Sequence, residues 1–225
     1  MHSLLKLMKH RKYEILLGSL ALLLFGQLLF PSGFDIQAIL MIQNIIAGLI
    51  LFSENKKMRA LLVGILACIL SLEIYSSFYQ WRTGSFISTG IYILYFLTIS
   101  IKVYVDVYRT KEVTSKMISA VFSGFIMLAL ISGLIFSLIE LGAPGSFSNL
   151  PDGLQKHQDL QYFGFVTTLT IGYGDITPIT VIAKKATILM GLLGNFYSVF
   201  VIGIVIGKFL PETRKLNYSN TSPNV

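Results

Sequence analysis

The sequence predicts an all-α membrane protein with six transmembrane helices and a re-entrant segment between the fifth and the sixth. Hydrophobic residues make up 54% of the 225 residues and charged residues only 13%, about half of the charged share of a soluble domain. The mean hydropathy is +0.71, and basic residues stand in short clusters between long apolar runs. A soluble core could not enclose so many apolar residues, so we expect the chain to lie in a lipid bilayer.

Six apolar runs approach the length that a helix needs to cross a bilayer, about 20 residues. None of them alternates apolar and polar residues with a period of two, so we expect helices and not a β-barrel. The runs are residues 13–30, 36–52, 58–79, 86–108, 116–139 and 179–210.

The positions of lysine and arginine predict the orientation of these helices. Basic clusters precede the first run, join the second to the third and the fourth to the fifth, and follow the sixth. Their members are Lys6, Lys9, Arg11, Lys12, Lys56, Lys57, Arg59, Arg109, Lys111, Lys116, Lys208, Arg214 and Lys215. The opposite side holds only Arg82, Lys156, Lys184 and Lys185. The positive-inside rule then places both termini in the cytoplasm, which agrees with an even number of crossings, and we expect the cell membrane as the location.

One interval does not fit a plain bundle of spanning helices. Residues 140–158 form a polar stretch rich in Gly, Pro and Ser, and the apolar run that follows, residues 159–169, is too short to cross. Asp159 is expected to cap the first turn of a short helix, with its carboxylate at the positive end of the helix dipole. We therefore expect a half-helix that enters from the outer face and ends inside the membrane.

The stretch Thr170-Ile171-Gly172-Tyr173-Gly174 follows this half-helix. Non-helical backbone at membrane depth is tolerated only where protein buries it or where it lines a water-filled path. The two glycines can take positive φ without steric cost, so alternation with ordinary residues lets successive carbonyls point to one side. Such a strip of carbonyls, with the threonine hydroxyl, can replace the water shell of a cation if symmetry supplies further copies of the strip.

The hexapeptide from Thr170 to Asp175, TIGYGD, resembles the selectivity-filter signature of potassium channels, with Ile171 where valine is commoner. The similarity extends over residues 115–210. It implies a potassium-selective pore made by four copies of the chain, with K⁺ as the permeant ion and as the only metal, bound at the filter. It implies no cofactor and no enzymatic activity.

The resemblance also implies roles for single residues. The filter carbonyls and the Thr170 hydroxyl coordinate K⁺, the Tyr173 ring braces the filter from behind, and Asp175 concentrates cations at the outer mouth. Two positions depart from the family pattern: Val166 stands where some bacterial channels have glutamate, and Phe163 where many have a tryptophan that donates a hydrogen bond toward the filter aspartate. We therefore expect Asp175 to lack this brace.

The sixth run carries glycines and polar residues within an apolar helix. Gly194 lies 24 positions after Thr170 and matches the hinge glycine of the family, although both Gly194 and Gly191 are equally explained by close helix packing. Asn195 and Ser198 are polar in a membrane helix, so they are candidates to face a water-filled cavity.

The fourth run lacks the regularly spaced arginines of a voltage sensor. Lys102 is its only basic residue, and Asp106 lies one helical turn away, where the two side chains can pair. Glu73 in the third run is another candidate countercharge for Lys102. We therefore expect weak voltage dependence, with the first four helices acting as a scaffold or as a receptor for another signal.

The predicted organisation is an N-terminal four-helix domain at residues 1–110, a pore domain at 111–210 and a short cytoplasmic tail at 211–225. The predicted function is a homotetrameric potassium channel, and the alternatives are a non-conducting regulatory channel subunit and a non-selective cation channel. His157 in the outer loop either senses external pH or is simply a solvated residue. The sequence indicates no nucleic-acid partner, and a separate regulatory protein or ligand is a further possible partner.

Overall fold

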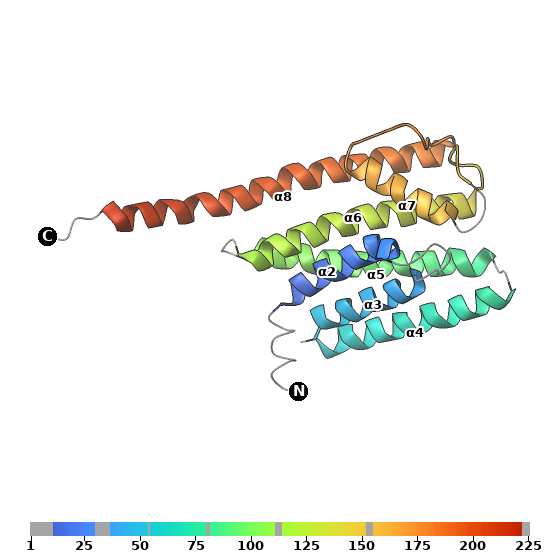
Figure 1. Cartoon of the computed structure of the whole chain (residues 1–225), viewed down its shortest axis with the longest axis horizontal. Coiled ribbons are helices and arrows are strands. Elements are labelled where there is room, and N and C mark those ends of the chain that lie inside the picture. The colour runs from blue at the N-terminus through green and yellow to red at the C-terminus, as the bar shows by residue number, and fades with distance from the viewer. Residues whose placement is uncertain are drawn as a thin grey trace.

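The computed structural model describes residues 11–29, 37–53, 55–79, 82–110, 114–151 and 155–221. These residues form seven α-helices and one 3₁₀ turn (Figure 1). The elements are α2 (Lys12–Phe25), η1 (Gly26–Leu29), α3 (Gln37–Leu51), α4 (Lys56–Tyr79), α5 (Arg82–Arg109), α6 (Ser115–Gly142), α7 (Gln155–Thr168) and α8 (Val181–Thr221). The all-α class is confirmed, since the β-pairing in these ranges is an isolated bridge between Phe147 and Pro178.

Two helices of the described ranges are long and apolar enough to cross a membrane, Thr83–Arg109 and Ser115–Gly142. Ile39–Leu51 is a shorter apolar helix. α2 and α3 contain 14 and 15 residues, fewer than the roughly 20 of a typical span. Each of the six predicted runs overlaps a helix, but the arrangement of six crossings stays a prediction.

α6 is the central helix of the fold, because it packs against α2, α5, α7 and α8 (Figure 1). On one side, buried side chains of α2 to α6 form a large apolar cluster that includes Leu16, Ile45, Phe96 and Met127. On the other side, a smaller cluster joins α6, α7 and α8. α6 is therefore the main connection between the N-terminal helices and the segment of the predicted filter.

The smaller cluster contains three aromatic rings from three different segments. Phe136 of α6, Phe147 of the following loop and Phe163 of α7 have ring centroids 5.0 to 5.6 Å apart. Their tilted and edge-on arrangements are those that aromatic pairs favour. Phe163 therefore serves to fix α7 against α6 and the loop.

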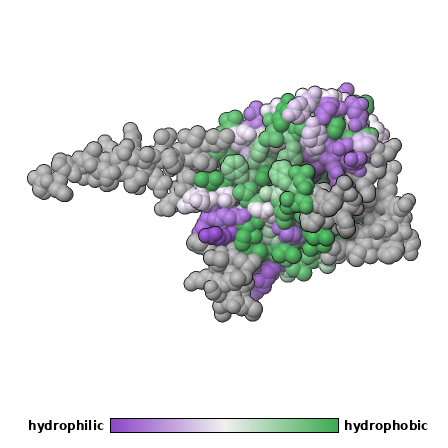
Figure 2. Space-filling view, in the orientation of Figure 1, coloured by the Kyte–Doolittle hydropathy of each residue, from purple (hydrophilic) through white to green (hydrophobic). Residues whose placement is uncertain are grey.

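Large apolar side chains cover much of the outer surface. Leu94, Ile101 and Phe122 are each about 60% exposed, at 61%, 61% and 59%. Figure 2 shows hydrophobic side chains across the middle of the bundle and hydrophilic ones gathered toward its two ends. An apolar surface of this extent is unusual for a soluble monomer and suits contact with lipid or with further subunits.

The start of α7 and the end of α8 differ from those predicted by several residues. α7 begins at Gln155, so Asp159 lies inside the helix, one turn from its start, and its expected role as the N-cap is wrong. The cap was placed at the edge of the apolar run, whereas the helix includes the polar residues before it. α8 continues to Thr221, past the expected end at residue 210, because the polar residues beyond Pro211 include strong helix formers that no apolar pattern marks.

Candidate functional site

α7 ends in a hydrogen-bonding pattern that reverses the chain direction. The Ile171 N–H donates to the Val166 carbonyl at 2.9 Å, and the Thr170 N–H donates to the Thr167 carbonyl at 3.0 Å. These two bonds define a Schellman motif, whose C′ residue must adopt the left-handed conformation. Thr170 occupies this position with φ +57°.

A threonine is an unusual choice for a left-handed residue. Glycine commonly fills this position at no steric cost, whereas a β-branched residue with positive φ is a rare outlier. The strain costs on the order of 1–3 kcal/mol and is typical of functional sites, where the surrounding structure enforces it. The hydroxyl of Thr170 is thus placed at the tip of α7 despite an energetic penalty.

Positive φ recurs at every second residue after the helix. Gly172 has φ +64° and Gly174 has φ +79°, as predicted, and the sequence analysis missed the same feature at Thr170. Ile171 and Tyr173 are 47% and 70% exposed in the single chain. Alternating left-handed residues allow successive carbonyls to face one side, which is the geometry that a strip of cation ligands needs.

Glycines seat α7 against both neighbouring helices. A Cβ on Gly164 would lie 2.8 Å from the Cα of Gly133 in α6, and a Cβ on Gly133 would lie 2.6 Å from the Cα of Gln161. On the α8 side, a Cβ on Gly194 would press on the backbone carbonyl of Thr168, with the carbonyl carbon 3.0 Å away. The end of α7 is therefore held by backbone-to-backbone packing on two sides.

This packing bears on the predicted hinge. α8 passes through Gly194 as a continuous helix, and Gly194 is buried against the last residue of α7. At Gly191 a Cβ would meet only Cγ2 of Thr167, at 3.9 Å. The geometry gives Gly194 a packing role, and its role as a hinge stays a prediction.

Two hydroxyl groups lie close together at the end of α7, directly before the predicted filter stretch (residues 170–174). Thr168 Oγ1 donates to the Gly164 carbonyl at 2.8 Å and lies 3.0 Å from Ser132 Oγ of α6. Both residues are buried. Val166 is also buried, at 4% exposure, and its apolar side chain offers no hydrogen bond. The polar support of this region therefore comes from Ser132 and Thr168.

The outer end of the filter stretch is braced by a residue that the sequence analysis did not identify. Tyr162 Oη donates to Oδ2 of Asp175 at 2.8 Å. The expectation that Asp175 lacks a brace is wrong. It rested on Phe163 alone, and successive residues of a helix point about 100° apart, so the neighbouring Tyr162 reaches Asp175 instead. Phe163 consequently faces the aromatic cluster, while Tyr162 faces the filter.

The Tyr162–Asp175 bond shifts the pKa values of both groups. It lowers the pKa of the Asp175 carboxyl, and it raises the pKa of the Tyr162 phenol. The bond is therefore fully present above the ordinary Asp pKa and is lost as pH falls through the lowered value. At alkaline pH it is lost as pH rises through the raised pKa of Tyr162.

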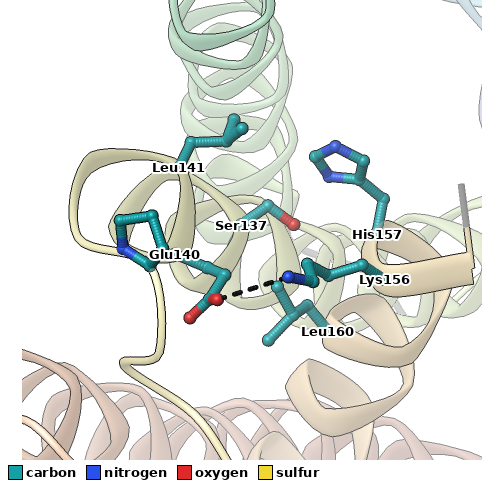
Figure 3. A pocket seen from close by; sticks show the side chains of 7 residues that line it. Ser137, Glu140, Leu141, Lys156, His157 and Leu160 are labelled. Carbon is teal, nitrogen blue, oxygen red and sulfur yellow. Dashed lines mark ion pairs between the residues drawn. The ribbon is translucent and has the colours of Figure 1, made fainter. Parts of the chain in front are cut away.

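A single carboxylate organises the loop before α7. Glu140, at the end of α6 and 5% exposed, accepts hydrogen bonds from the N–H groups of Gly145 and Ser146 at 2.9 Å and of Phe147 at 3.3 Å. Lys156 Nζ of α7 lies 3.6 Å from Oε1 of Glu140 (Figure 3). Glu140 therefore fixes both the loop and the start of α7.

The loop in turn holds the segment that follows the filter. The Ser148 N–H donates to the Thr177 carbonyl at 2.9 Å, and the two hydroxyls lie 2.6 Å apart. The Ile179 N–H donates to the Ser146 carbonyl at 2.8 Å, and Asn149 Nδ2 donates to the Asp175 carbonyl at 2.8 Å. The sequence signal for this arrangement was an acidic residue at the end of an apolar helix, directly before a Gly- and Ser-rich stretch.

A pocket of about 250 Å³ opens between the end of α6 and the start of α7. It is lined by Ser137, Glu140, Leu141, Pro144, Lys156, His157 and Leu160 (Figure 3). His157 is exposed at its rim. Burial of part of the ring and then the charge of Lys156 lower the pKa of its imidazole, so the ring becomes charged at a lower pH than that of an ordinary histidine.

The remaining candidates lie apart from the filter stretch. Asn195 is exposed on α8, and Ser198 Oγ donates to the Gly194 carbonyl of its own helix at 3.1 Å. Lys102 Nζ contacts Oδ1 of Asp106 at 2.7 Å, which confirms the predicted pair. The Tyr13 hydroxyl also donates to Asp106. The side chain of Glu73 lies outside the described residues.

Comparison with known proteins defines the class to which this site belongs. Residues 147–210 match a protein family described as "Ion channel". The matched segment contains α7, the filter stretch and the first 30 residues of α8. Residues 147–210 are therefore similar to an ion-channel pore domain, which is a membrane module and not an enzyme.

A particular relative agrees with this class. The chain is similar to "Two pore potassium channel c" of Oryza sativa subsp. japonica, with 41% identity over 63 residues. The aligned part is 28% of this chain and 14% of the relative, so the similarity concerns a small part of both proteins. No solved structure matches the chain.

The close packing of α7 against α6 predicts that Gly164→Ala lowers the stability of the protein. The added methyl group would press on the backbone of α6, and overpacking of this kind costs roughly 1–3 kcal/mol. We expect a melting temperature several degrees lower for the purified protein in detergent, measured by tryptophan or scattering-based thermal unfolding. Gly90→Ala is the matched control, since a Cβ there meets no atom within 4 Å. Equal melting temperatures for both variants would contradict the close packing.

The brace predicts a change in acidity when Tyr162 is replaced by Phe. Loss of the phenol removes the main cause of the lowered pKa of Asp175, so that pKa should rise toward the ordinary value. The measurement is a ¹³C NMR titration of the Asp175 carboxyl carbon in nanodiscs. Asn149→Gly is the control, because Asn149 has φ +57° and bonds only to the backbone carbonyl of Asp175. An unchanged titration in Tyr162→Phe would show that the hydrogen bond is absent in solution.

Proposed function

We propose that the chain is a subunit of a potassium-selective channel. The observation that carries the proposal is the alternation of left-handed residues at Thr170, Gly172 and Gly174, directly after a short helix. The stretch lies within the segment that matches ion channels, and 63 residues of the chain are 41% identical to a two-pore potassium channel.

Conduction follows from replacement of the ion's water shell. Carbonyls of Thr170, Ile171, Gly172, Tyr173 and Gly174, together with the Thr170 hydroxyl, coordinate dehydrated K⁺ at successive sites. Asp175, held by Tyr162, raises the local concentration of cations at the outer mouth. The negative end of the α7 dipole faces the inner side of the filter and stabilises a cation there.

Four copies of the chain are needed to surround the ion. One strip of carbonyls leaves most of the coordination shell open, and unpaired polar groups in lipid cost several kcal/mol each. A homotetramer closes the ring. The proposal is supported by the apolar side chains that α8 leaves uncovered in the single chain: Val181, Ile188, Val199 and Phe200 are 61% to 67% exposed.

The proposed topology has six crossings with both termini in the cytoplasm. It is supported by the positions of the basic clusters and by the apolar surface of the bundle. In this topology the loop held by Glu140 faces the outside, and the C-terminal part of α8 reaches the cytoplasmic side. Asn195 and Ser198 then face the cavity below the filter in the assembled pore.

The filter assignment predicts loss of selectivity in Thr170→Cys and Gly172→Ala. The first variant replaces the coordinating hydroxyl, and the second adds a Cβ to a residue with positive φ. We expect the permeability ratio of K⁺ to Na⁺ to fall by tenfold or more, or conduction to stop. The measurement is the reversal potential of purified protein in planar bilayers with mixed K⁺ and Na⁺.

Gly145→Ala is the matched control for backbone strain. Gly145 has φ +81° and an open surrounding, so alanine is strained there as it is at Gly172, but the residue lies in the loop and not in the filter. Unchanged K⁺ preference in both filter variants would refute the assignment.

The charge content of α5 predicts weak voltage dependence. One charge that crosses the full potential gains about 2.3 kcal/mol per 100 mV, and steep gating uses three to four charges per subunit. Between its terminal arginines α5 carries one basic residue, Lys102, which is paired with Asp106 at 2.7 Å, so little net charge within the membrane can move. We expect a limiting slope of at most about four elementary charges per tetramer, unchanged in Lys102→Gln. A much steeper slope in symmetric K⁺ would mean that another charge moves.

A further inference from the structure

Three helices meet at one turn of α6. Tyr104 Oη of α5 donates to the Gly124 carbonyl at 3.2 Å, and Tyr197 Oη of α8 donates to the Val121 carbonyl at 2.6 Å. The two tyrosine rings have centroids 5.6 Å apart, and Phe125 of α6 lies 5.4 Å from Tyr197. α5 and α8 therefore contact each other and the same turn of the helix between them.

The absence of a side chain at Gly124 permits this arrangement. A Cβ there would lie 2.6 Å from Tyr197 Oη and 2.9 Å from Cε1 of Tyr104. Helical carbonyls have a second lone pair beyond their intrahelical bond, and only a glycine leaves room for two rings to reach these carbonyls together. We call Tyr104, Gly124 and Tyr197 the tyrosine junction.

On α8 the tyrosine junction lies about one helical turn C-terminal to the contact with α7, the helix that precedes the predicted filter. Tyr197 follows Gly194 by three residues, which is about 4.5 Å along the helix axis, and Gly194 is packed against Thr168 at the end of α7. A displacement of α8 at Tyr197 therefore acts next to the contact that seats the filter helix, on the side that leads to the cytoplasm.

On α5 the junction lies opposite the contact with α2. Tyr104 stands between Lys102 and Asp106, and a step of two residues turns about 200° around a helix. Asp106 bonds to Tyr13 of α2 and to Lys102. α5 is thus attached to the N-terminal bundle by one face and to the pore helices by the other.

We propose that the tyrosine junction is the regulatory contact through which the N-terminal helices bias the position of α8, and thereby the opening of the pore. The inference rests on the proposed channel function. The two hydroxyls bind carbonyls of a single helical turn, so movement of α5 relative to α6 or α8 requires these bonds to break and others to form. Contacts of this kind have discrete arrangements, which is what a coupling element requires.

The test is single-channel recording of the purified full chain in planar bilayers with symmetric K⁺. Tyr104→Phe and Tyr197→Phe remove one hydroxyl each and keep the rings. We expect each to shift the ratio of open to closed time by about threefold or more, in the same direction, since interhelical hydrogen bonds in membranes have about this strength. Unitary conductance and the K⁺ to Na⁺ permeability ratio should not change.

The double variant and a control sharpen the result. The tyrosine rings are in contact, so the double variant should depart from the product of the single effects by at least about twofold. Thr98→Val, also on α5, removes a hydroxyl that bonds to the Leu94 carbonyl of its own helix at 2.7 Å, and it should leave gating unchanged. Gly124→Ala should shift the same ratio more strongly, because it displaces both rings.

The outcomes separate the inference from the proposed function. A wild-type chain that carries no K⁺-selective current would overturn the proposed function, and the inference with it. A K⁺-selective wild type whose Phe variants gate normally, or change conductance or selectivity instead of the open-to-closed ratio, would overturn the inference alone.

Discussion

The left-handed conformation of Thr170 is the constraint on which the rest of the pore segment depends. The Schellman bonds at the end of α7 require one residue with positive φ, and the chain places a β-branched residue there, followed by glycines at the next two alternate positions. The strain at Thr170 is worth only a few kcal/mol, comparable to the net stability of an ordinary hydrogen bond or two. The left-handed conformation of Thr170 therefore persists only if the surrounding contacts prevent the backbone from adopting another conformation.

Those surroundings restrain the filter stretch at both of its ends. At the inner end, Gly164 and Gly194 bring the backbones of α6 and α8 into contact with α7, so the helix cannot slide to relieve the strain. At the outer end, Glu140 fixes the loop whose backbone holds the segment after the filter, and Tyr162 holds the Asp175 carboxylate. The two restraints differ in kind. The inner one is steric and insensitive to pH, whereas the outer one includes the Tyr162–Asp175 hydrogen bond, which is lost when Asp175 becomes protonated.

The sequence predicted the helices and the left-handed glycines because both leave local signals. Apolar runs mark helices in a membrane protein, and alternate glycines mark left-handed backbone. It did not predict which aromatic residue faces the filter, because a one-residue error in helical phase exchanges Tyr162 with Phe163. Nor did it identify Glu140, whose partners are backbone N–H groups that every residue carries. The start of α7 was misplaced for a related reason, since its first turn is polar and has no apolar period.

The composition of the first four helices also gives no local signal for a role in gating. A voltage sensor is recognisable from its charges, whereas the interior of α5, between its terminal Arg82 and Arg109, has one basic residue, Lys102, which is paired with Asp106. What remains to transmit a signal is contact, and contact depends on residues that look ordinary in the sequence, such as a glycine and two tyrosines far apart in the chain. Tyr104 and Tyr197 are separated by 93 positions yet lie side by side, because Gly124 of α6 has no side chain to separate them. With the predicted filter restrained at both ends, the proposed route from the N-terminal helices to the pore is the tyrosine junction on α8, because α8 extends beyond the restrained region.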